Sequence, residues 1–359
     1  MKIAIGYKIH KDSWGGGNQF VTSLNQYAKS NGHEIVYELK DKNIDIILIV
    51  DPRSYEQDIP FSLFDIFKYL LFTNKNAIVV HRINECDERK NTKYMNMMLR
   101  RTNFLADHTV FIASWLRNLK IYQKDKSCSV ILNGANTNFF NSSRSNFWNK
   151  KSPLKIVTHH WSCNFNKGFD IYEKLDRMLT SKKWMDKIRF TYIGNIPSKY
   201  NFCRTRHLLP IHGDKLGIEL SKHHVYLTAS LNEPSGNHHI EAAQCGLPLL
   251  YIDSGGIPEY CEGFGISFNK SNFESKLNEM IEDYKIYVNN IGEYSLNSEK
   301  MSKNYENLFN DMLSNKDDVI NRRKKLKLNI IERFLYKTSR RIDKFFNAIY
   351  LKYFDSKFD

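Results

Sequence analysis

The sequence predicts an α/β protein with two doubly wound domains, and three observations lead to this prediction. Short runs that are almost entirely apolar, such as 44–51 and 77–82, alternate with segments whose apolar residues recur at helical spacing. This alternation is typical of parallel sheets that are buried on both faces. The same alternation restarts after residue 153. The chain has 359 residues, of which 42% are apolar, and this is enough for two separate cores.

The first domain is predicted to span 1–150. It opens with a strand at 2–6, followed by a glycine-rich loop and a helix that ends near residue 30. Further strands are predicted at 33–39, 44–51, 77–82, 109–113 and 129–132, and further helices at 62–71 and 94–106. The loop contains Gly15, Gly16 and Gly17, and consecutive glycines let the backbone approach a ligand closely. A plain surface loop is the alternative, because the spacing is not the G-x-G-x-x-G of a dinucleotide-binding turn.

The second domain is predicted to span 151–297, after a polar linker at 141–152. Its strands are predicted at 154–159, 188–193, 208–212, 225–231, 249–253 and 264–268, and its helices at 168–179, 215–223 and 272–284. The helical pattern resumes at residue 298. We expect the segment 298–320 to pack back toward the first domain.

Composition narrows the class of protein. No apolar run approaches the roughly 18 residues of a membrane-spanning helix. The chain begins directly with a strand, so no signal peptide is expected. The six cysteines form no C-x-x-C pair, which is typical of reduced cysteines in a cytoplasmic protein. We therefore expect the protein to be cytoplasmic.

Basic residues are concentrated in the tail, 321–359. It contains 12 Lys or Arg and 4 Asp or Glu, which supplies +8 of the net charge of +14. Its large apolar residues recur mostly at helical spacing, and a basic amphipathic helix binds anionic membrane surfaces. The tail is therefore predicted to hold the protein at the inner face of a membrane. A helix packed on the body or on a partner is the alternative, and no nucleic-acid recognition motif accompanies the basic residues.

The segment 232–241 (Asn-Glu-Pro-Ser-Gly-Asn-His-His-Ile-Glu) is the most informative stretch of the chain. It lies between a predicted strand and a predicted helix, where a turn directs backbone N–H groups and the helix dipole toward one point and so suits a phosphate. Glu233 and Glu241 flank this point. Carboxylates there are expected to bind hydroxyl groups, because a second anion would be repelled. A nucleotide sugar, with phosphates between two polyols, fits this arrangement.

Several companion motifs accompany this segment in a fixed order. They are Gly15-Gly16-Gly17, Asn133-Gly134-Ala135-Asn136 with Phe140, Lys167-Gly168, Glu233-x7-Glu241, Cys245-Gly246-Leu247-Pro248 and Gly255-Gly256-Ile257-Pro258-Glu259. Together they resemble the motifs of retaining nucleotide-sugar glycosyltransferases of family 4, over residues 1–265. The resemblance implies the GT-B fold, in which two Rossmann-like domains face a cleft.

The resemblance also implies roles for individual residues. Glu241 would bind the ribose hydroxyls, Glu233 would approach the donor sugar, and Lys167 would neutralise the departing diphosphate. The backbone amides of the phosphate cradle would come from Gly16, Gly17, Gly236, Asn237 and His238. Fixed donors and a lysine aimed at developing phosphate charge lower the barrier to departure, so no metal or other cofactor is expected. Without the companion motifs, the glutamates would be helix-dipole and surface carboxylates and Lys167 an ordinary solvated lysine.

The chain departs from the family pattern at one position. Family members carry an arginine five residues before the lysine, whereas this chain has Ser162. Arg204, Arg206 or a histidine are the alternatives for the second cation.

On the acceptor side, the end of the predicted strand 77–82 should face the cleft. In family 4 this strand end holds a residue near the reacting sugar, so the resemblance implies His81 or Asp87 in that place. His81 could equally be a histidine with a purely structural role. Paired histidines occur at 159–160, 223–224 and 238–239. Neighbouring side chains point apart on a strand or helix and no third ligand is suitably spaced, so a metal site is not predicted.

These observations predict a metal-independent, retaining glycosyltransferase that uses a UDP- or GDP-linked sugar. Its acceptor is expected to be a glycan, in particular a lipid-linked precursor of a surface polysaccharide such as a capsule or O-antigen. The alternatives are a nucleotide-sugar epimerase on the same fold and a non-catalytic protein that binds nucleotides or nucleic acid.

Overall fold

A computed structural model describes residues 1–10, 15–53, 58–121, 127–198 and 200–324, and contains two parallel six-stranded sheets. The first sheet contains β1 (Lys2–Ile5), β2 (Glu34–Val36), β3 (Ile46–Ile49), β4 (Ile78–Ile83), β5 (His108–Phe111) and β6 (Ser127–Val130). The second contains β7 (Leu154–His160), β8 (Ile188–Gly194), β9 (Arg206–Leu208), β10 (Val225–Thr228), β11 (Leu249–Ile252) and β12 (Gly265–Phe268). The predicted fold class of two Rossmann-like halves is confirmed.

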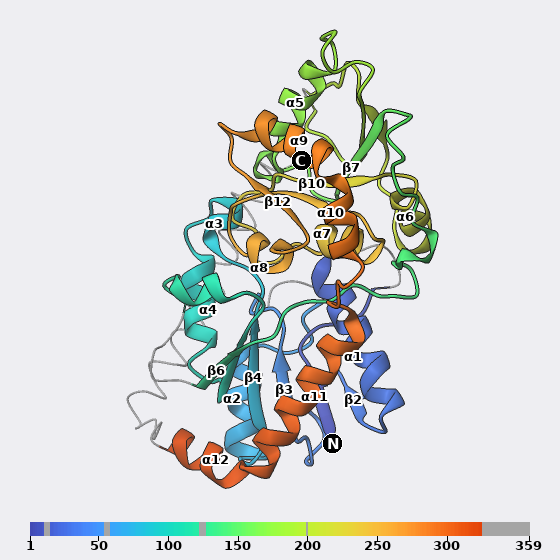
Figure 1. Cartoon of the computed structure of the whole chain (residues 1–359). Coiled ribbons are helices and arrows are strands. Elements are labelled where there is room, and N and C mark those ends of the chain that lie inside the picture. The colour runs from blue at the N-terminus through green and yellow to red at the C-terminus, as the bar shows by residue number, and fades with distance from the viewer. Residues whose placement is uncertain (11–14, 54–57, 122–126, 199, 325–359) are drawn as a thin grey trace.

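Helices cover both sheets (Figure 1). In the first half these are α1 (Gly16–Ser30), α2 (Leu63–Phe72), α3 (Asp87–Lys90) and α4 (Met95–Thr102). In the second half they are α5 (Phe169–Met178), α6 (Gly213–Leu220), α7 (Asn237–Gln244), α8 (Ile257–Cys261), α9 (Phe273–Glu282) and α10 (Tyr284–Ile291). The chain continues into α11 (Ser298–Ser314) and α12 (Lys316–Lys324).

The order of the strands indicates where each sheet would bind a ligand. The orders are β2-β1-β3-β4-β5-β6 and β12-β11-β10-β7-β8-β9, so the direction of winding reverses beside β1 in one sheet and between β7 and β10 in the other. Ligands of open α/β sheets bind outside the carboxyl ends of the strands at such reversal points. In this chain α1 follows β1 and α7 follows β10, so both helices begin at those points.

Several predicted elements have other bounds in the structure; the strand predicted at 33–39, for example, is β2, which covers only Glu34–Val36. The strand predicted at 208–212 is β9, which ends at Leu208; Pro210 has no N–H to continue the ladder, and the chain from Pro210 to Gly213 instead lines a pocket. The helix predicted at 272–284 ends at Glu282, and α10 begins directly after Asp283.

The chain passes between the two halves twice, and the two passages pair with each other. Ala135 forms an isolated β-bridge with Asn297, and the Ser298 amide donates to the Ala135 carbonyl at 2.8 Å. A Cβ at Gly134 would lie 2.0 Å from the Asn297 carbonyl oxygen. Only glycine therefore fits in the middle of the Asn133–Asn136 motif.

The last helices lie along the first half of the molecule (Figure 1). Tyr305 of α11 packs its ring 5.1 Å from that of Phe20 on α1. In α12, Arg323 binds Asp107 and donates to the Ala77 carbonyl at 2.7 Å. The domain boundaries at 150 and 297 stay predictions, and most of the predicted basic tail, 325–359, lies outside the described residues. None of the described helices is long and apolar enough to cross a membrane.

Candidate functional site

A pocket of about 260 Å³ lies between the two halves, where the reversal points of the sheets face each other. The first half contributes residues of the glycine loop, β4 and α3; the second contributes the ends of β7 and β8, the segment before α6, and the 233–241 motif. All of the predicted donor-binding residues line it: Gly16, Gly17, Gly236, Asn237, His238 and Glu241. Lys167 and Glu233 also line it.

Two helix N-termini meet at this pocket. Among the described residues, neither α1 nor α7 has a side-chain cap at its N-cap position or an acidic residue in its first turn. The positive end of each dipole is therefore not offset by the helix itself. The helices touch through Asn237, whose Nδ2 donates to Oε1 of Gln19 at 2.7 Å. Gly16 lies against the same side chain, since a Cβ there would be 3.2 Å from Nδ2 of Asn237. Gly236 adopts a φ of 79°, which favours glycine at the start of α7.

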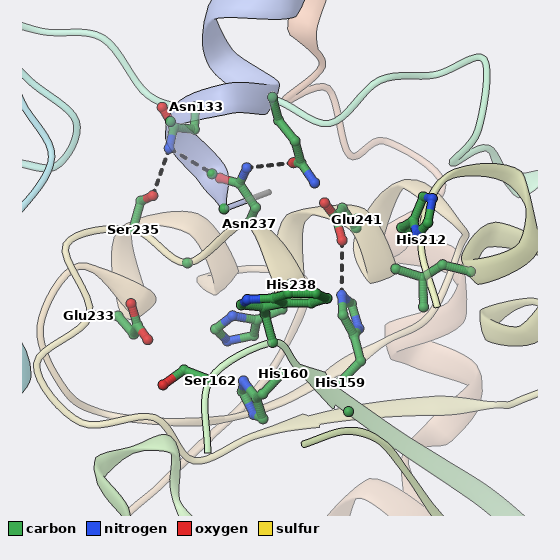
Figure 2. Close-up of a pocket in the computed structure, with 18 of the residues that line it drawn as sticks. Asn133, His159, His160, Ser162, His212, Glu233, Ser235, Asn237, His238 and Glu241 are labelled. Carbon is green, nitrogen blue, oxygen red and sulfur yellow. Dashed lines mark hydrogen bonds and ion pairs between the residues drawn. The ribbon is translucent and has the colours of Figure 1, made fainter. Parts of the chain in front are cut away.

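Asn133 joins the two halves beside these helix ends. Its Oδ1 accepts from Arg82 at 2.9 Å. Its Nδ2 donates to Ser235 at 2.8 Å and to Asn237 at 3.2 Å (Figure 2). Arg82 is 1% exposed and its guanidinium lies 4.0 Å from the centre of the Phe20 ring. In the part of the chain that the structure describes, no carboxylate forms an ion pair with Arg82. The pocket therefore carries a buried positive charge next to the α7 N-terminus.

Glu241 lines the same pocket and is held by His159. The His159 Nε2 atom is 2.8 Å from Oε2 of Glu241 (Figure 2). Glu241 is 3% exposed, and its other oxygen, Oε1, has no hydrogen-bond partner among the described residues. Buried polar atoms are nearly always hydrogen-bonded, so Oε1 is suited to accept a hydroxyl group.

Glu233 is held between two cations from opposite halves. Lys167 donates to Oε1 of Glu233, and Nε of Arg89 lies 3.4 Å from Oε2. Burial by itself would raise the pKa of Glu233, but Lys167 and Arg89 outweigh burial and lower the pKa to about 2. Glu233 is therefore charged at neutral pH.

Lys167 reaches this position through the turn η3 (Phe165–Lys167). Gly168 follows with a φ of 96°, and a Cβ there would lie 2.4 Å from Cβ of Ala229. The glycine of the Lys167-Gly168 pair thus allows η3 to pack against the end of β10. This close approach places the lysine beside Glu233.

Three further histidines lie around these groups. Nε2 of His160 is 2.7 Å from the Tyr172 hydroxyl, and Thr228 contacts His238 at 2.9 Å. Burial lowers the pKa of His239 to about 3 and lowers those of His160 and His238 as well. These imidazoles are therefore neutral. No cluster of His, Cys, Asp or Glu among the described residues could hold a metal ion.

The expected acceptor-side residues are not in the pocket. His81 is fully buried within β4, and its neighbour Arg82 lines the pocket instead. Successive side chains of a strand point to opposite faces, so Arg82 and not His81 lies on the face of β4 that reaches the pocket. That His81 lies near the reacting sugar stays a prediction. The carboxylate of Asp87 accepts from the amides of Tyr94 at 3.0 Å and Met95 at 2.8 Å. It holds the start of α4 and does not line the pocket.

The alternatives for the missing cation can also be compared. Ser162 lines the pocket, as expected, but Arg204 and Arg206 do not; Arg206 binds Glu219 at 2.8 Å. Among the described lining residues, the lysines and arginines are Arg82, Arg89 and Lys167. The sequence interpretation missed Arg82 and Arg89, although both lie in the same segment as His81 and Asp87.

Comparisons with known proteins agree with this architecture. No protein-family model matches the chain. The chain is 23% identical over 205 residues to the gpi3 subunit of phosphatidylinositol N-acetylglucosaminyltransferase from Schizosaccharomyces pombe, a match that covers 53% of this chain and 44% of that protein. The chain thus spans less than half of this curated relative.

Among solved structures, the chain is similar to sucrose-phosphate synthase from Thermosynechococcus elongatus, with a TM-score of 0.60, 14% identity and coverage of 87% of this chain and 99% of the other. It is equally similar to Anabaena HepE in complex with UDP-glucose, with a TM-score of 0.60, 13% identity and coverage of 88% and 100%. The chain has the GT-B fold. The resemblance that the sequence motifs indicated is confirmed at this level, and the cleft of the GT-B fold is the pocket described above.

Proposed function

We propose that this GT-B protein is a retaining glycosyltransferase that moves a sugar from a nucleotide sugar to a glycan acceptor. The observation that carries the proposal is the meeting of α1 and α7 at one pocket, with both N-termini uncapped and Lys167 beside them. Such a site attracts phosphate. Glu233 and Glu241 flank it and are suited to hydroxyl groups, so the ligand has phosphates in the middle and hydroxyls at both ends.

Relatives support a UDP-linked donor. The Anabaena HepE structure contains UDP-glucose. The pneumococcal O-GlcNAc transferase GtfA, with a TM-score of 0.56, 14% identity and coverage of 77% of this chain and 59% of that chain, was solved with UDP and GlcNAc. We propose a UDP-sugar as the donor of this chain, with a GDP-sugar as the alternative.

In the proposed reaction the residues mainly position and stabilise charge. Glu241 binds the ribose through Oε1, and Glu233 binds hydroxyls of the donor sugar. As the bond from the sugar to the diphosphate breaks, negative charge builds on phosphate oxygens, and Lys167 and the helix N-termini stabilise it. The acceptor attacks from the same face, and the leaving phosphate takes its proton. No nucleophilic side chain is required for this route.

The acceptor is proposed to be a lipid-linked precursor of a surface polysaccharide, at the inner face of a membrane. Two features support this proposal. The curated relative is named for a phosphatidylinositol acceptor, and the segment 321–359 carries +8 of the net charge of +14, which suits an anionic lipid surface.

A panel of nucleotide sugars tests the proposal. UDP or GDP at millimolar concentration should raise the melting temperature, because a ligand that binds only the folded state stabilises it. One nucleotide sugar of the panel should then release its diphosphate only when a glycan acceptor is added. Conversion of the donor without acceptor would indicate an epimerase instead. Stabilisation by nucleic acid and not by nucleotides would indicate a binding protein.

A further inference from the structure

The clearest unassigned feature of the pocket is Arg89. It belongs to α3 of the first half, whereas Lys167 belongs to the second half, and both contact the carboxylate of Glu233. Nε of Arg89 lies 3.4 Å from one oxygen, and Lys167 binds the other. The two cations therefore stand at the two ends of a single carboxylate group.

We propose that Arg89 is the second cation for the donor diphosphate and takes the place of the arginine that Ser162 replaces. The inference rests on the proposed function. It means that the diphosphate is bound by one cation from each domain, so that donor binding also ties the domains together.

The geometry favours this role. Two cations that bind opposite oxygens of one carboxylate are spaced to bind neighbouring oxygens of a diphosphate as well. A guanidinium presents several N–H groups in a planar fork that matches phosphate. When Glu233 turns to the hydroxyls of a donor sugar, both cations become available to the phosphates.

Glu85 keeps Arg89 in position. Nη1 of Arg89 donates to Oε2 of Glu85 at 2.7 Å, and the attraction of Glu85 raises the pKa of Arg89 above its usual value. The side chain of Arg89 is 28% exposed. The guanidinium is therefore charged, anchored at one end and accessible from the pocket.

The other cations are less suitable. Arg82 is 1% exposed and uses Nη2 to hold Asn133, so it contributes charge from below the surface of the pocket. Arg206 binds Glu219 and does not line the pocket.

Backbone contacts fix α3 against the second domain. The Arg89 carbonyl accepts from Nδ2 of Asn166 at 3.2 Å, and the Glu88 carbonyl accepts from Nδ2 of Asn232 at 3.2 Å. Asn166 lies in η3 beside Lys167, and Asn232 directly precedes Glu233. Arg89 thus lies beside Lys167 through contacts between the two halves, and a ligand that contacts both cations favours this arrangement of the halves.

The test compares a nucleoside diphosphate with the matching monophosphate. Calorimetry should show that Arg89→Gln weakens binding of UDP about 10- to 100-fold, the effect of losing one charge-assisted hydrogen bond. Binding of UMP should change much less, so the preference for UDP over UMP should collapse. Arg89→Lys, which keeps the charge, should recover part of the preference for UDP over UMP. Arg206→Gln is the matched control and should leave the preference unchanged. If the wild type prefers GDP, then GDP and GMP are used instead.

The outcomes separate the two proposals. A wild type that binds neither UDP nor GDP contradicts the proposed function. A wild type that binds UDP, together with an Arg89→Gln variant of unchanged UDP/UMP preference, overturns only the role of Arg89; this is also the result expected if Arg89 merely orients Glu233. Should Arg89→Gln fail to fold, the double variant Glu85→Gln/Arg89→Gln removes the ion pair without leaving a lone carboxylate, and the same comparison applies to it.

Discussion

Lys167 donates a hydrogen bond to Glu233, and the two side chains are 11% and 4% exposed. Breaking a buried ion pair by removing one partner is far more damaging than replacing both, because the remaining charge stays buried without compensation. The pair links the end of the second domain's η3 turn to its central motif. Its two members hold the groups that the proposed reaction requires, one for the leaving phosphate and one for the sugar.

Replacement of Glu233 by glutamine should have opposite effects on the affinity for UDP and on the rate of sugar transfer. The neutral amide no longer competes with phosphate for Lys167 and Arg89, so UDP should bind roughly 10-fold more tightly, the size of one charge-assisted contact. Transfer of the sugar should nevertheless fall, because the sugar loses its carboxylate. Calorimetry with UDP and a turnover assay with the nucleotide sugar measure both effects. Weaker UDP binding by the variant would contradict the competition.

Replacement of Lys167 by alanine should lower the turnover number about 10²- to 10³-fold, as expected for loss of one group that stabilises charge in the transition state. The exposed Lys182→Ala is the control and should retain wild-type turnover. Circular dichroism must show that Lys167→Ala still folds, because it leaves Glu233 paired only with Arg89. Turnover at the wild-type level in a folded Lys167→Ala protein would exclude the assigned role.

Glu241 should make the affinity for UDP depend on the ribose hydroxyls. Its Oε1 atom is buried and unpartnered among the described residues, so UDP should bind about 10- to 100-fold more tightly than a 2′,3′-dideoxy analogue. Glu241→Gln should lose most of this preference and most transfer. His159→Ala should reduce the preference less, since it removes only the group that holds Glu241. Equal affinity of the wild type for UDP and for the dideoxy analogue would show that Glu241 does not bind the ribose hydroxyls.

Stability should fall on mild acidification. Burial lowers the pKa of His223 and His224 to about 4 and that of His239 to about 3. Between these values and the unfolded value of about 6.5, the unfolded chain binds more protons than the folded one. The free energy of unfolding therefore decreases as the pH falls from about 6.5, by about 1.4 kcal/mol per pH unit for each such histidine.

Urea unfolding at pH 7 and at pH 5 measures this dependence. The variant His223→Gln should be less stable at pH 7, because it disturbs contacts with Glu219 and Thr191, but its stability should depend less on pH. The same midpoint at both pH values for the wild type would show that these histidines do not titrate as described.

A test of the predicted membrane tail requires a truncation that leaves Arg323 in place. Arg323 binds Asp107, which is 4% exposed on its side chain, so removing 321–359 should also destabilise the first domain, by about 3 kcal/mol. A chain of residues 1–324 keeps this ion pair. It should melt like the full chain and yet lose binding to vesicles with anionic lipids in a flotation assay. Equal flotation of both chains would remove the membrane proposal.

Local patterns were sufficient to predict the framework of this protein. Apolar runs and glycine-rich turns identify parallel strands and the loops that follow them, because burial on both faces and positive φ angles restrict the residue types at those positions. The assignment of Gly16, Lys167 and the 233–241 motif to one cleft also required the resemblance to family 4 glycosyltransferases, because without it Lys167 would be taken for an ordinary solvated lysine.

The orientation of individual side chains depends on packing between segments far apart in the chain. Arg82 and not His81 faces the pocket because the register of β4 within its sheet decides which face each residue occupies. Asp87 caps α4 because its partners, Tyr94 and Met95, fold back onto it. Arg89 reaches Glu233, 144 positions away, only across the domain interface. The sequence thus determined the fold and the motif, while the tertiary structure decided which charges share the pocket, since that depends on contacts between domains.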